Sequence, residues 1–349
     1  MTIVCIQDKI TWDKFENEFD KEQIRWRFFE TVPTNALERV LVRLKLTNLA
    51  RMISCYWCVR SIKENPADLL VSHGPSITFW CAIYIRMLGI KINQISFGLN
   101  FTPLPKRLKY ALMKFAFRKV DKFVVYSSEE ALLYNRVLAI PKTKIDFVRW
   151  GVGVPHVPED EKPVIKGEYV CSMGYNYRDF DIIVEAARQI SEVKIVLIVG
   201  SRDLKKLIKG LPQNVNVYAD IDISKALNIL KYSKFMILSL KGDRIAAGHV
   251  TLVAAMHMGK AAVVSKSPYL NDYLLEGETA LTFKCGDIDS LLNSIKHLWF
   301  DNALCGKLGE NGRSFASQYC SEKITVDKIK EIVKEFGSKS ADETIAISF

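Results

Sequence analysis

Apolar and polar positions alternate in a regular order over the second half of the chain. From about residue 167 onward, short apolar runs are followed by longer amphipathic stretches, which predicts strands that alternate with helices. Parallel strands joined by helical crossovers form a doubly wound sheet, whose ligands bind beyond the carboxyl ends of the strands. The expected strands are 169–173, 194–199, 215–218, 235–240, 261–265 and 280–283, and the expected helices include 181–190, 223–232, 250–258 and 288–299.

The first half shows a less regular form of the same pattern. Residues 151–166, between the halves, are rich in Gly, Pro and charge and lack periodicity, which is typical of an interdomain linker. The sequence therefore predicts an α/β protein with two doubly wound, Rossmann-like domains. The expected strands of the first half are 3–6, 69–72, 92–97, 123–126 and 145–148. The expected divisions are 1–150, the linker 151–166, 167–320, a helix at 321–337 that packs across both domains, and a tail at 338–349.

Length and composition are those of a globular protein. The 349 residues are 49% apolar and 25% charged, which fits two domains and excludes a disordered chain. No apolar run approaches the about 20 residues that cross a bilayer. Residues 1–20 carry too many charges for a signal-peptide core, so we expect a cytoplasmic protein.

The eight cysteines are scattered and lie mostly in apolar surroundings, which favours a role as small core residues. Cys55 and Cys58 have the spacing of a redox or zinc half-site. No second Cys pair or His pair exists to complete a four-ligand shell, so no metal site is expected there.

The net charge of +10 is concentrated in the first half. Residues 1–160 hold 24 Lys and Arg against 16 Asp and Glu, a balance that favours an anionic partner. Segments 36–60 and 104–123 interleave cations with large apolar residues at helical spacing; in the second these are Leu108, Leu112, Phe115 and Phe117. They are either ordinary surface helices or a face that lies on an anionic membrane. Nucleic acid is not expected, because no nucleic-acid-binding motif accompanies the charge.

Residues 247–265, AGHVTLVAAMHMGKAAVVS, form the most informative segment. It follows the expected strand 235–240 and begins a helix between Gly248 and Thr251. A glycine allows close approach of the backbone, the first-turn amides of a helix are unpaired, and Thr251 adds a hydroxyl, which together suit an anionic phosphate. Taken alone, a glycine before a helix more often only makes a turn.

This segment resembles the donor site of GT-B glycosyltransferases of family 4, where a small-residue loop leads into a helix ending in EAMxxGKPVV. Other segments resemble the family in the same order, and the combination spans most of residues 121–320. They are 147–153 (FVRWGVG), 172–179 (SMGYNYRD), 273–281 (YLLEGETAL), 286–287 (GD) and 308–313 (LGENGR).

The resemblance implies a two-domain GT-B enzyme. It would transfer a sugar, with retention of configuration, from a nucleotide-sugar donor in the second domain to an acceptor in the first, within the cleft between them. It also implies that no cofactor or metal is needed, because basic side chains and helix amides neutralise the diphosphate. The expected partners are the nucleotide sugar, a glycan or glycolipid acceptor that is lipid-linked or membrane-proximal, and an anionic membrane surface.

The sequence departs from the family at two glutamates. Ala246 and Ala254 occupy the positions where the family usually carries this pair, so the usual contact with the donor ribose or sugar is missing. A catalytically inactive GT-B scaffold that binds nucleotide sugars is therefore the alternative.

Three side chains are predicted to be catalytic: His73, Arg178 and Lys241. Arg178 would offer its fork to the diphosphate or pair with a neighbouring aspartate at the surface. Lys241 follows a strand and is either a diphosphate ligand or a solvated loop lysine. His73 would polarise an acceptor hydroxyl or contact the sugar, or it is a buried histidine bonded to the backbone.

The remaining expected contacts follow other strands. On the donor side they are Gly174, Tyr175, Asn176, Gly248, His249, Val250 and Thr251, and on the acceptor side Gly74, Asn100 and Thr102. His249 is as often a capping or packing residue in this position. Asp220 and Asp222 imitate the metal-binding DxD of the other glycosyltransferase architecture, but between a strand and a helix an N-cap is the better interpretation.

Overall fold

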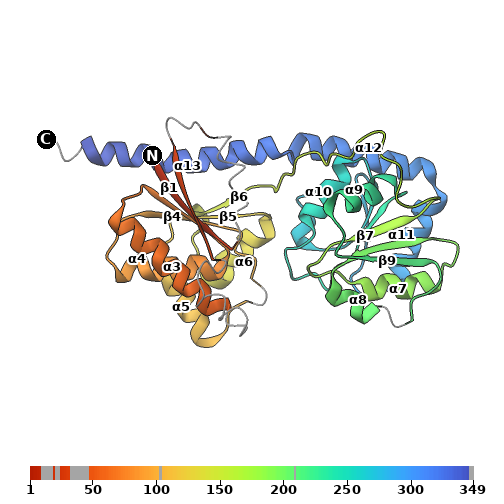
Figure 1. Ribbon diagram of the computed structural model, residues 1–349, viewed down its shortest axis with the longest axis horizontal. Coiled ribbons are helices and arrows are strands. Elements are labelled where there is room, and N and C mark those ends of the chain that lie inside the picture. The colour runs from red at the N-terminus through yellow and green to blue at the C-terminus, as the bar shows by residue number, and fades with distance from the viewer. Residues whose placement is uncertain (9–18, 20–23, 32–46, 102–103, 208–209, 346–349) are drawn as a thin grey trace. The chain divides into compact units, whose positions relative to one another are not determined.

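The computed structural model describes residues 1–8, 19, 24–31, 47–101, 104–207 and 210–345 (Figure 1). The chain forms two compact units. Unit 1 comprises Met1–Val148 and Val326–Phe349, and unit 2 comprises Arg149–Thr325. The chain therefore leaves unit 1 once and returns to it.

Unit 1 contains a parallel sheet with the order β2-β1-β3-β4-β5-β6. Ile3 of β1 packs in one cluster with Val333 of α13, and the adjacent Val4 packs with Val59 of α3 on the other face. Both faces are thus buried, which explains the nearly continuous apolar runs of these strands. The strands are β1 (Thr2–Gln7), β2 (Arg25–Glu30), β3 (Leu69–His73), β4 (Asn93–Phe97), β5 (Lys122–Val125) and β6 (Ile145–Phe147). The helices are α3 (Thr47–Glu64), α4 (Pro75–Met87), α5 (Arg107–Phe117), α6 (Ser128–Leu138) and most of α13 (Glu322–Ile345).

Unit 2 contains a second parallel sheet, with the order β12-β11-β10-β7-β8-β9. Val170 and Cys171 of β7 face opposite clusters, the first with α7 and α11 and the second with α9 and α10. The strands are β7 (Val170–Met173), β8 (Ile195–Val199), β9 (Val215–Ala219), β10 (Met236–Leu238), β11 (Ala262–Ser265) and β12 (Leu281–Phe283). The helices are α7 (Phe180–Arg188), α8 (Ser201–Leu207), α9 (Ile223–Tyr232), α10 (His249–His257), α11 (Ile288–Phe300) and α12 (Asn302–Tyr319).

The predicted fold class is confirmed by these two sheets with helices on both faces. Residues 151–166, expected as a linker, belong to unit 2 and are held to α9. The side chain of Asn228 accepts a hydrogen bond from Val164 N at 3.0 Å and donates one to Lys162 O at 3.1 Å. The boundary between the units instead falls at Val148.

The expected tail at 338–349 is wrong as far as residue 345, because α13 continues to Ile345. The first residues of α13 belong to unit 2 and those from Val326 onward to unit 1. Thr325 ties the start of the helix to unit 2, since its hydroxyl donates to Arg149 O and accepts from Gly151 N. In unit 1, Ile329 and neighbouring apolar residues pack on the sheet.

Candidate active site

The first turn of α10 lies beyond the carboxyl end of β10. Gly248 precedes the helix with a φ of +99°, and a Cβ there would lie 2.9 Å from Leu238 Cδ2. Any other residue would therefore meet both backbone strain and a clash. No side chain caps the helix, and Val250 in its first turn is 53% exposed. The amides of this turn are thus available to an anion.

Arg178 lies beside this turn, and its guanidinium is buried, with 6% of the residue exposed. Nε donates to Met173 O at 3.0 Å, Nη1 to Asn176 O at 3.0 Å, and Nη2 to Thr251 Oγ1 at 2.9 Å. Burial lowers the pKa of Arg178 to about 10, which still leaves it charged at neutral pH. The alternative that Arg178 pairs with a neighbouring aspartate at the surface is wrong, because its acceptors are two carbonyls and a hydroxyl.

The loop after β7 is shaped around this arginine. Gly174 has a φ of +137°, and a Cβ there would lie 2.6 Å from Arg178 Nε. Tyr177 takes a φ of +57°, a conformation that side chains rarely adopt and that is frequent at functional sites. Asn176 and the two tyrosines of this loop are exposed, and the ring of Tyr175 lies over Gly200, whose Cβ would meet it at 3.0 Å.

The two other basic residues among the candidates of unit 2 are Lys241 and His249, and they differ in exposure to solvent. Lys241 is exposed, and its backbone N donates to Tyr177 O at 3.0 Å, so it lies beside the same loop. His249 is buried; its Nε2 lies 2.9 Å from Tyr269 O, and its ring packs on Tyr273 with centroids 4.6 Å apart. Burial lowers the pKa of His249. His249 is therefore a neutral packing residue, the alternative that its position had left open.

Asp220 and Asp222 differ from their expected role as caps of one helix. Asp222 occupies the N-cap position of α9, but its side chain makes no capping bond. Asp220 instead accepts hydrogen bonds from the backbone N and the hydroxyl of Ser201, at the beginning of α8. No group of three acidic, His or Cys residues suited to a metal occurs within the described part of the chain.

A pocket of about 360 Å³ lies in unit 1, at the carboxyl ends of its strands. It brings together the predicted His73, Gly74 and Asn100, whereas Thr102 lies outside the described residues. The ring of His73 stacks on Phe97, with centroids 5.5 Å apart. Burial lowers the pKa of His73 to about 3, so the imidazole is neutral at physiological pH. The other lining residues are Asp8, Asn48, Arg51, Pro75, Ser76, Ile77, Phe101, Lys109 and Met113.

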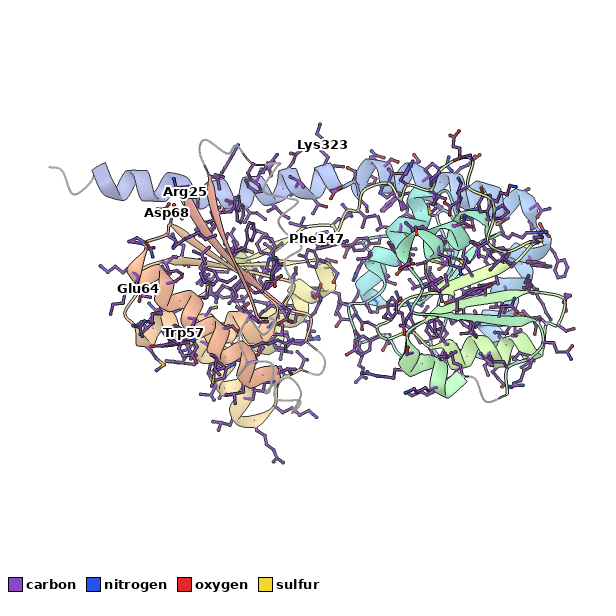
Figure 2. All side chains as sticks on the ribbon, in the orientation of Figure 1. Arg25, Trp57, Glu64, Asp68, Phe147 and Lys323 are labelled. Atoms are coloured by element: carbon purple, nitrogen blue, oxygen red, sulfur yellow. The ribbon has the colours of Figure 1, made fainter. Side chains whose placement is uncertain are left out.

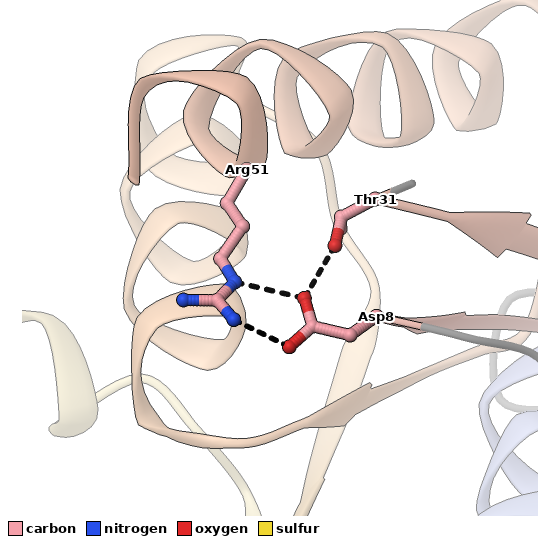
Figure 3. Close-up of polar contacts among 3 residues, drawn as sticks. All are labelled: Asp8, Thr31 and Arg51. Carbon is pink, nitrogen blue, oxygen red and sulfur yellow. Dashed lines mark hydrogen bonds and ion pairs between the residues drawn. The ribbon is translucent and has the colours of Figure 1, made fainter. Parts of the chain in front are cut away.

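One wall of this pocket is an ion pair that the sequence did not indicate (Figure 3). Arg51 donates to both carboxylate oxygens of Asp8, from Nε at 2.8 Å and from Nη2 at 2.6 Å. The hydroxyl of Thr31 donates to the same carboxylate at 2.5 Å. Burial acts to raise the pKa of Asp8, but the bonds from Arg51 and Thr31 outweigh it and the pKa is lowered. Asp8 directly follows β1, so the rule that ligands bind after parallel strands would have found it.

The basic helix α5 carries an exposed apolar stripe. Leu108, Leu112 and Phe115 are 72%, 45% and 52% exposed, and they are spaced by four and three residues, so they share one helix face. Phe117 is buried, so its expected place on that stripe is wrong. The guanidinium of Arg86 lies 4.0 Å from the centre of the Phe115 ring. In the other basic segment, Trp57 on α3 is 53% exposed (Figure 2).

Cys55 and Cys58 are buried on α3, and burial raises the pKa of both thiols. They therefore act as core residues, as the sequence predicts. No helix in the described part of the chain is both long and apolar enough to cross a membrane. A second pocket, of about 230 Å³, follows β11 in unit 2 and is lined in part by Lys266, Ser267 and Asn271, which sequence reasoning missed.

The chain is similar in structure to several known proteins over nearly its whole length. The chain is similar to the crystal structure of HepE from Anabaena with UDP, with a TM-score of 0.76 and 15% identity. The alignment covers 96% of this chain and 100% of the HepE chain. For sucrose-phosphate synthase from Thermosynechococcus elongatus, the alignment covers 97% of this chain and 99% of the synthase chain, with a TM-score of 0.73 and 14% identity. For a glycosyltransferase from Rickettsia africae, the alignment covers 96% of this chain and 98% of the other chain, with a TM-score of 0.72 and 14% identity. No curated protein matches the chain in sequence.

The two doubly wound units and these likenesses define the fold as that of the GT-B glycosyltransferases. Within it, residues 168–301 match the model of the family described as Glycosyl transferases group 1. The match falls within unit 2, and the beginning of α10 and the Arg178 loop both lie inside the matched range.

Proposed function

We propose that this chain transfers a sugar from a nucleotide-sugar donor at the beginning of α10 to an acceptor hydroxyl in the pocket of unit 1. The observation that carries the proposal is the cluster of Gly174, Arg178 and Thr251 beside the uncapped first turn of α10. A helix N-terminus and a buried guanidinium both favour negative charge. The donor diphosphate is the anion that fits this place.

The chemistry that we propose is electrostatic. When the bond between the sugar and the diphosphate breaks, negative charge develops on the diphosphate, and fixed positive groups stabilise that charge most where water is excluded. The α10 amides and Arg178 are fixed, and the exposed Lys241 lies beside the Arg178 loop, where its side chain can reach the diphosphate. The proposal needs no metal and includes retention of configuration, which the resemblance to family 4 implies. Neutral His73 would orient the acceptor hydroxyl as a hydrogen-bond partner.

The donor is tested first by ligand-induced stability. HepE has been crystallised with UDP and with UDP-glucose, so UDP-glucose is the first donor to try, beside GDP-, ADP- and dTDP-sugars. A ligand at 100 times its Kd adds about 2.7 kcal/mol of stability, which a thermal melt detects. Failure of every nucleotide and nucleotide sugar to stabilise the chain would refute the donor site.

An inactive donor-binding scaffold is the second candidate, and the two alanines at 246 and 254 favour it. Their methyl groups cannot accept hydrogen bonds from ribose or sugar hydroxyls. The scaffold binds a nucleotide sugar but neither transfers nor hydrolyses it, so release of nucleoside diphosphate over hours separates the two functions. Turnover with any acceptor would exclude the scaffold.

We also propose that unit 1 lies on an anionic membrane through the α5 face, defined by Leu108, Leu112 and Phe115. Three exposed apolar side chains on one helix face, on a helix rich in cations, are typical of interfacial helices. Each cation near an anionic surface contributes about 1 kcal/mol, and salt screens that attraction. The acceptor would then be a lipid-linked or membrane-proximal glycan.

Vesicle sedimentation tests this face. Binding is expected to phosphatidylglycerol vesicles and not to phosphatidylcholine vesicles, and to weaken in 0.5 M salt. Replacing both Leu112 and Phe115 by Asp should abolish it. Leu132→Asp is the matched control, because Leu132 is 53% exposed on α6 and outside the α5 face. Equal binding of both vesicle types, or of the double variant and the parent, would refute the membrane proposal and leave the donor site untouched.

A further inference from the structure

We infer that the pocket of unit 1 binds an anionic group of the acceptor, a phosphate ester, next to the hydroxyl that receives the sugar. The inference rests on the proposed function, because it names the chemistry of the acceptor that the pocket holds. It is carried by the charges that converge on the pocket.

The side-chain charges in the pocket sum to a positive value. Asp8 and Arg51 neutralise one another through two hydrogen bonds. Lys109, exposed on α5 at the pocket wall, adds a charge that no acidic residue balances among the lining residues that the structure describes. His73 is neutral, so it neither adds to this balance nor subtracts from it. Arg51 uses Nε and Nη2 for Asp8, so its Nη1 takes no part in that ion pair.

The backbone adds a second positive element. Residues 74–77, the beginning of α4, line the pocket, and Gly74 precedes the helix with a φ of +81° and no capping side chain. The helix is 13 residues long, so its aligned peptide dipoles place partial positive charge at this end. Pro75 has no N–H, and the amides of Ser76 and Ile77 cannot bond within the helix. A phosphate oxygen is the partner that fits such amides beside a lysine.

The same pocket offers partners for sugar hydroxyls. Asn48, Asn100 and the ionised Asp8 carry amide or carboxylate oxygens, and Phe101 and Met113 supply apolar surface. A volume of about 360 Å³ lies within the usual range of small-ligand sites. A phosphorylated sugar therefore matches both parts of the lining, whereas an uncharged sugar leaves Lys109 and the α4 amides unused.

The phosphate could belong to a lipid-linked acceptor or to a soluble sugar phosphate. Lys109 follows Leu108 directly on α5, so the helix that supplies the cation also carries the exposed apolar stripe. Both sources share the same phosphate chemistry, and separate arms of one experiment distinguish them.

The first arm titrates inorganic phosphate into the full chain saturated with UDP, so that the diphosphate site of unit 2 is already filled. Chloride at equal ionic strength is the reference. Lys109→Gln should weaken phosphate binding roughly tenfold, because a charge-assisted hydrogen bond is lost. Lys119→Gln is the matched control, since Lys119 is exposed and does not line the pocket. The Kd for UDP should be the same in both variants.

Phosphate binding no stronger than that of chloride, or equal weakening in both variants, would overturn the inference. If UDP itself does not bind, the donor site fails, and the comparison of Lys109→Gln with Lys119→Gln in the free protein still decides the pocket. The second arm compares polyprenyl phosphate with polyprenol in phosphatidylcholine vesicles, and glucose 6-phosphate with glucose in solution. Preference for the phosphorylated member in one pair identifies the source; preference in neither overturns the inference.

Discussion

Replacing Thr251 by Val tests the donor site with little change of shape. The substitution removes the hydroxyl that accepts from Arg178 Nη2 at 2.9 Å, and it keeps the branched side chain. Helix propensities of Thr and Val are similar, so α10 itself should form equally well. Arg178 keeps its bonds to Met173 O and Asn176 O but has one buried N–H without its acceptor.

The expected loss of stability follows from the positive charge of Arg178, which donates the hydrogen bond. A hydrogen bond to a charged group contributes about 1.5–3 kcal/mol, and a buried donor left without a partner adds to the cost. We therefore expect the free energy of local opening of α10 and the Arg178 loop, measured by hydrogen exchange, to fall by about 2 kcal/mol. The affinity for UDP should fall roughly tenfold for each 1.4 kcal/mol lost at the site.

Hydrogen exchange of the α10 amides is the suitable assay, because a chain with two units does not unfold in a single two-state step. Calorimetry gives the UDP affinity of the same samples. Thr251→Ser, which keeps the hydroxyl, should restore most of both values. Protection and affinity equal to those of the parent in Thr251→Val would show that the Arg178 bond neither stabilises the loop nor shapes the diphosphate site.

Two further predictions concern protonation and metals. The buried His73 has a pKa of about 3, below the value of 6.5 in an unfolded chain, so the unfolded state takes up a proton first as the pH falls. The stability of unit 1 should therefore decrease between pH 6.5 and pH 4 by up to about 1.4 kcal/mol per pH unit from this residue, and hydrogen exchange of the β3 amides should show a shallower decrease in His73→Gln. Transfer should persist in excess EDTA, because Asp220 bonds to Ser201 rather than facing a metal; activity that EDTA abolishes and Mn²⁺ restores would contradict this.

The second half of the fold could be predicted from the sequence because its strands are buried on both faces. Runs such as Ile195–Val199 are then continuously apolar and stand out between amphipathic helices. The strand Arg25–Glu30 was missed for the opposite reason. It reads RWRFFE, which mixes charges with aromatic rings, and it is the edge strand of the sheet within the described residues, where its one partner is β1.

The end of α13 shows a different limit. A helix is recognised from its apolar stripe, and the segment 338–345 has none. Each residue added to an existing helix forms one more backbone hydrogen bond, so a helix can continue past its last packed residue without a stripe. Among the residues of α13 whose burial the structure describes, Phe336 is the last that packs in the core of unit 1.

The sequence predicts which residues gather at the beginning of α10, but it predicts only in part which residues line the pocket of unit 1. Gly248 and Thr251 are close in sequence and lie where one helix begins, so a local pattern is enough to place them together. Asp8, Arg51 and Lys109 come from three separate segments, and only the packing of α3 and α5 around the sheet brings them to one pocket. Periodicity identifies each helix but does not indicate which of its cations faces a neighbour.

The buried state of Arg178 changes the role that its sequence position suggested. Its Nε, Nη1 and Nη2 all donate to protein acceptors, so it holds the loop against α10 rather than presenting an empty fork. Its charge would still attract the diphosphate of the proposed donor, because Coulomb attraction needs no direct hydrogen bond. Two unit charges about 5 Å apart attract by about 3 kcal/mol at an effective dielectric constant of about 20. In the function that we propose, direct contacts with the diphosphate then fall to the α10 amides and to Lys241, which is exposed beside the same loop.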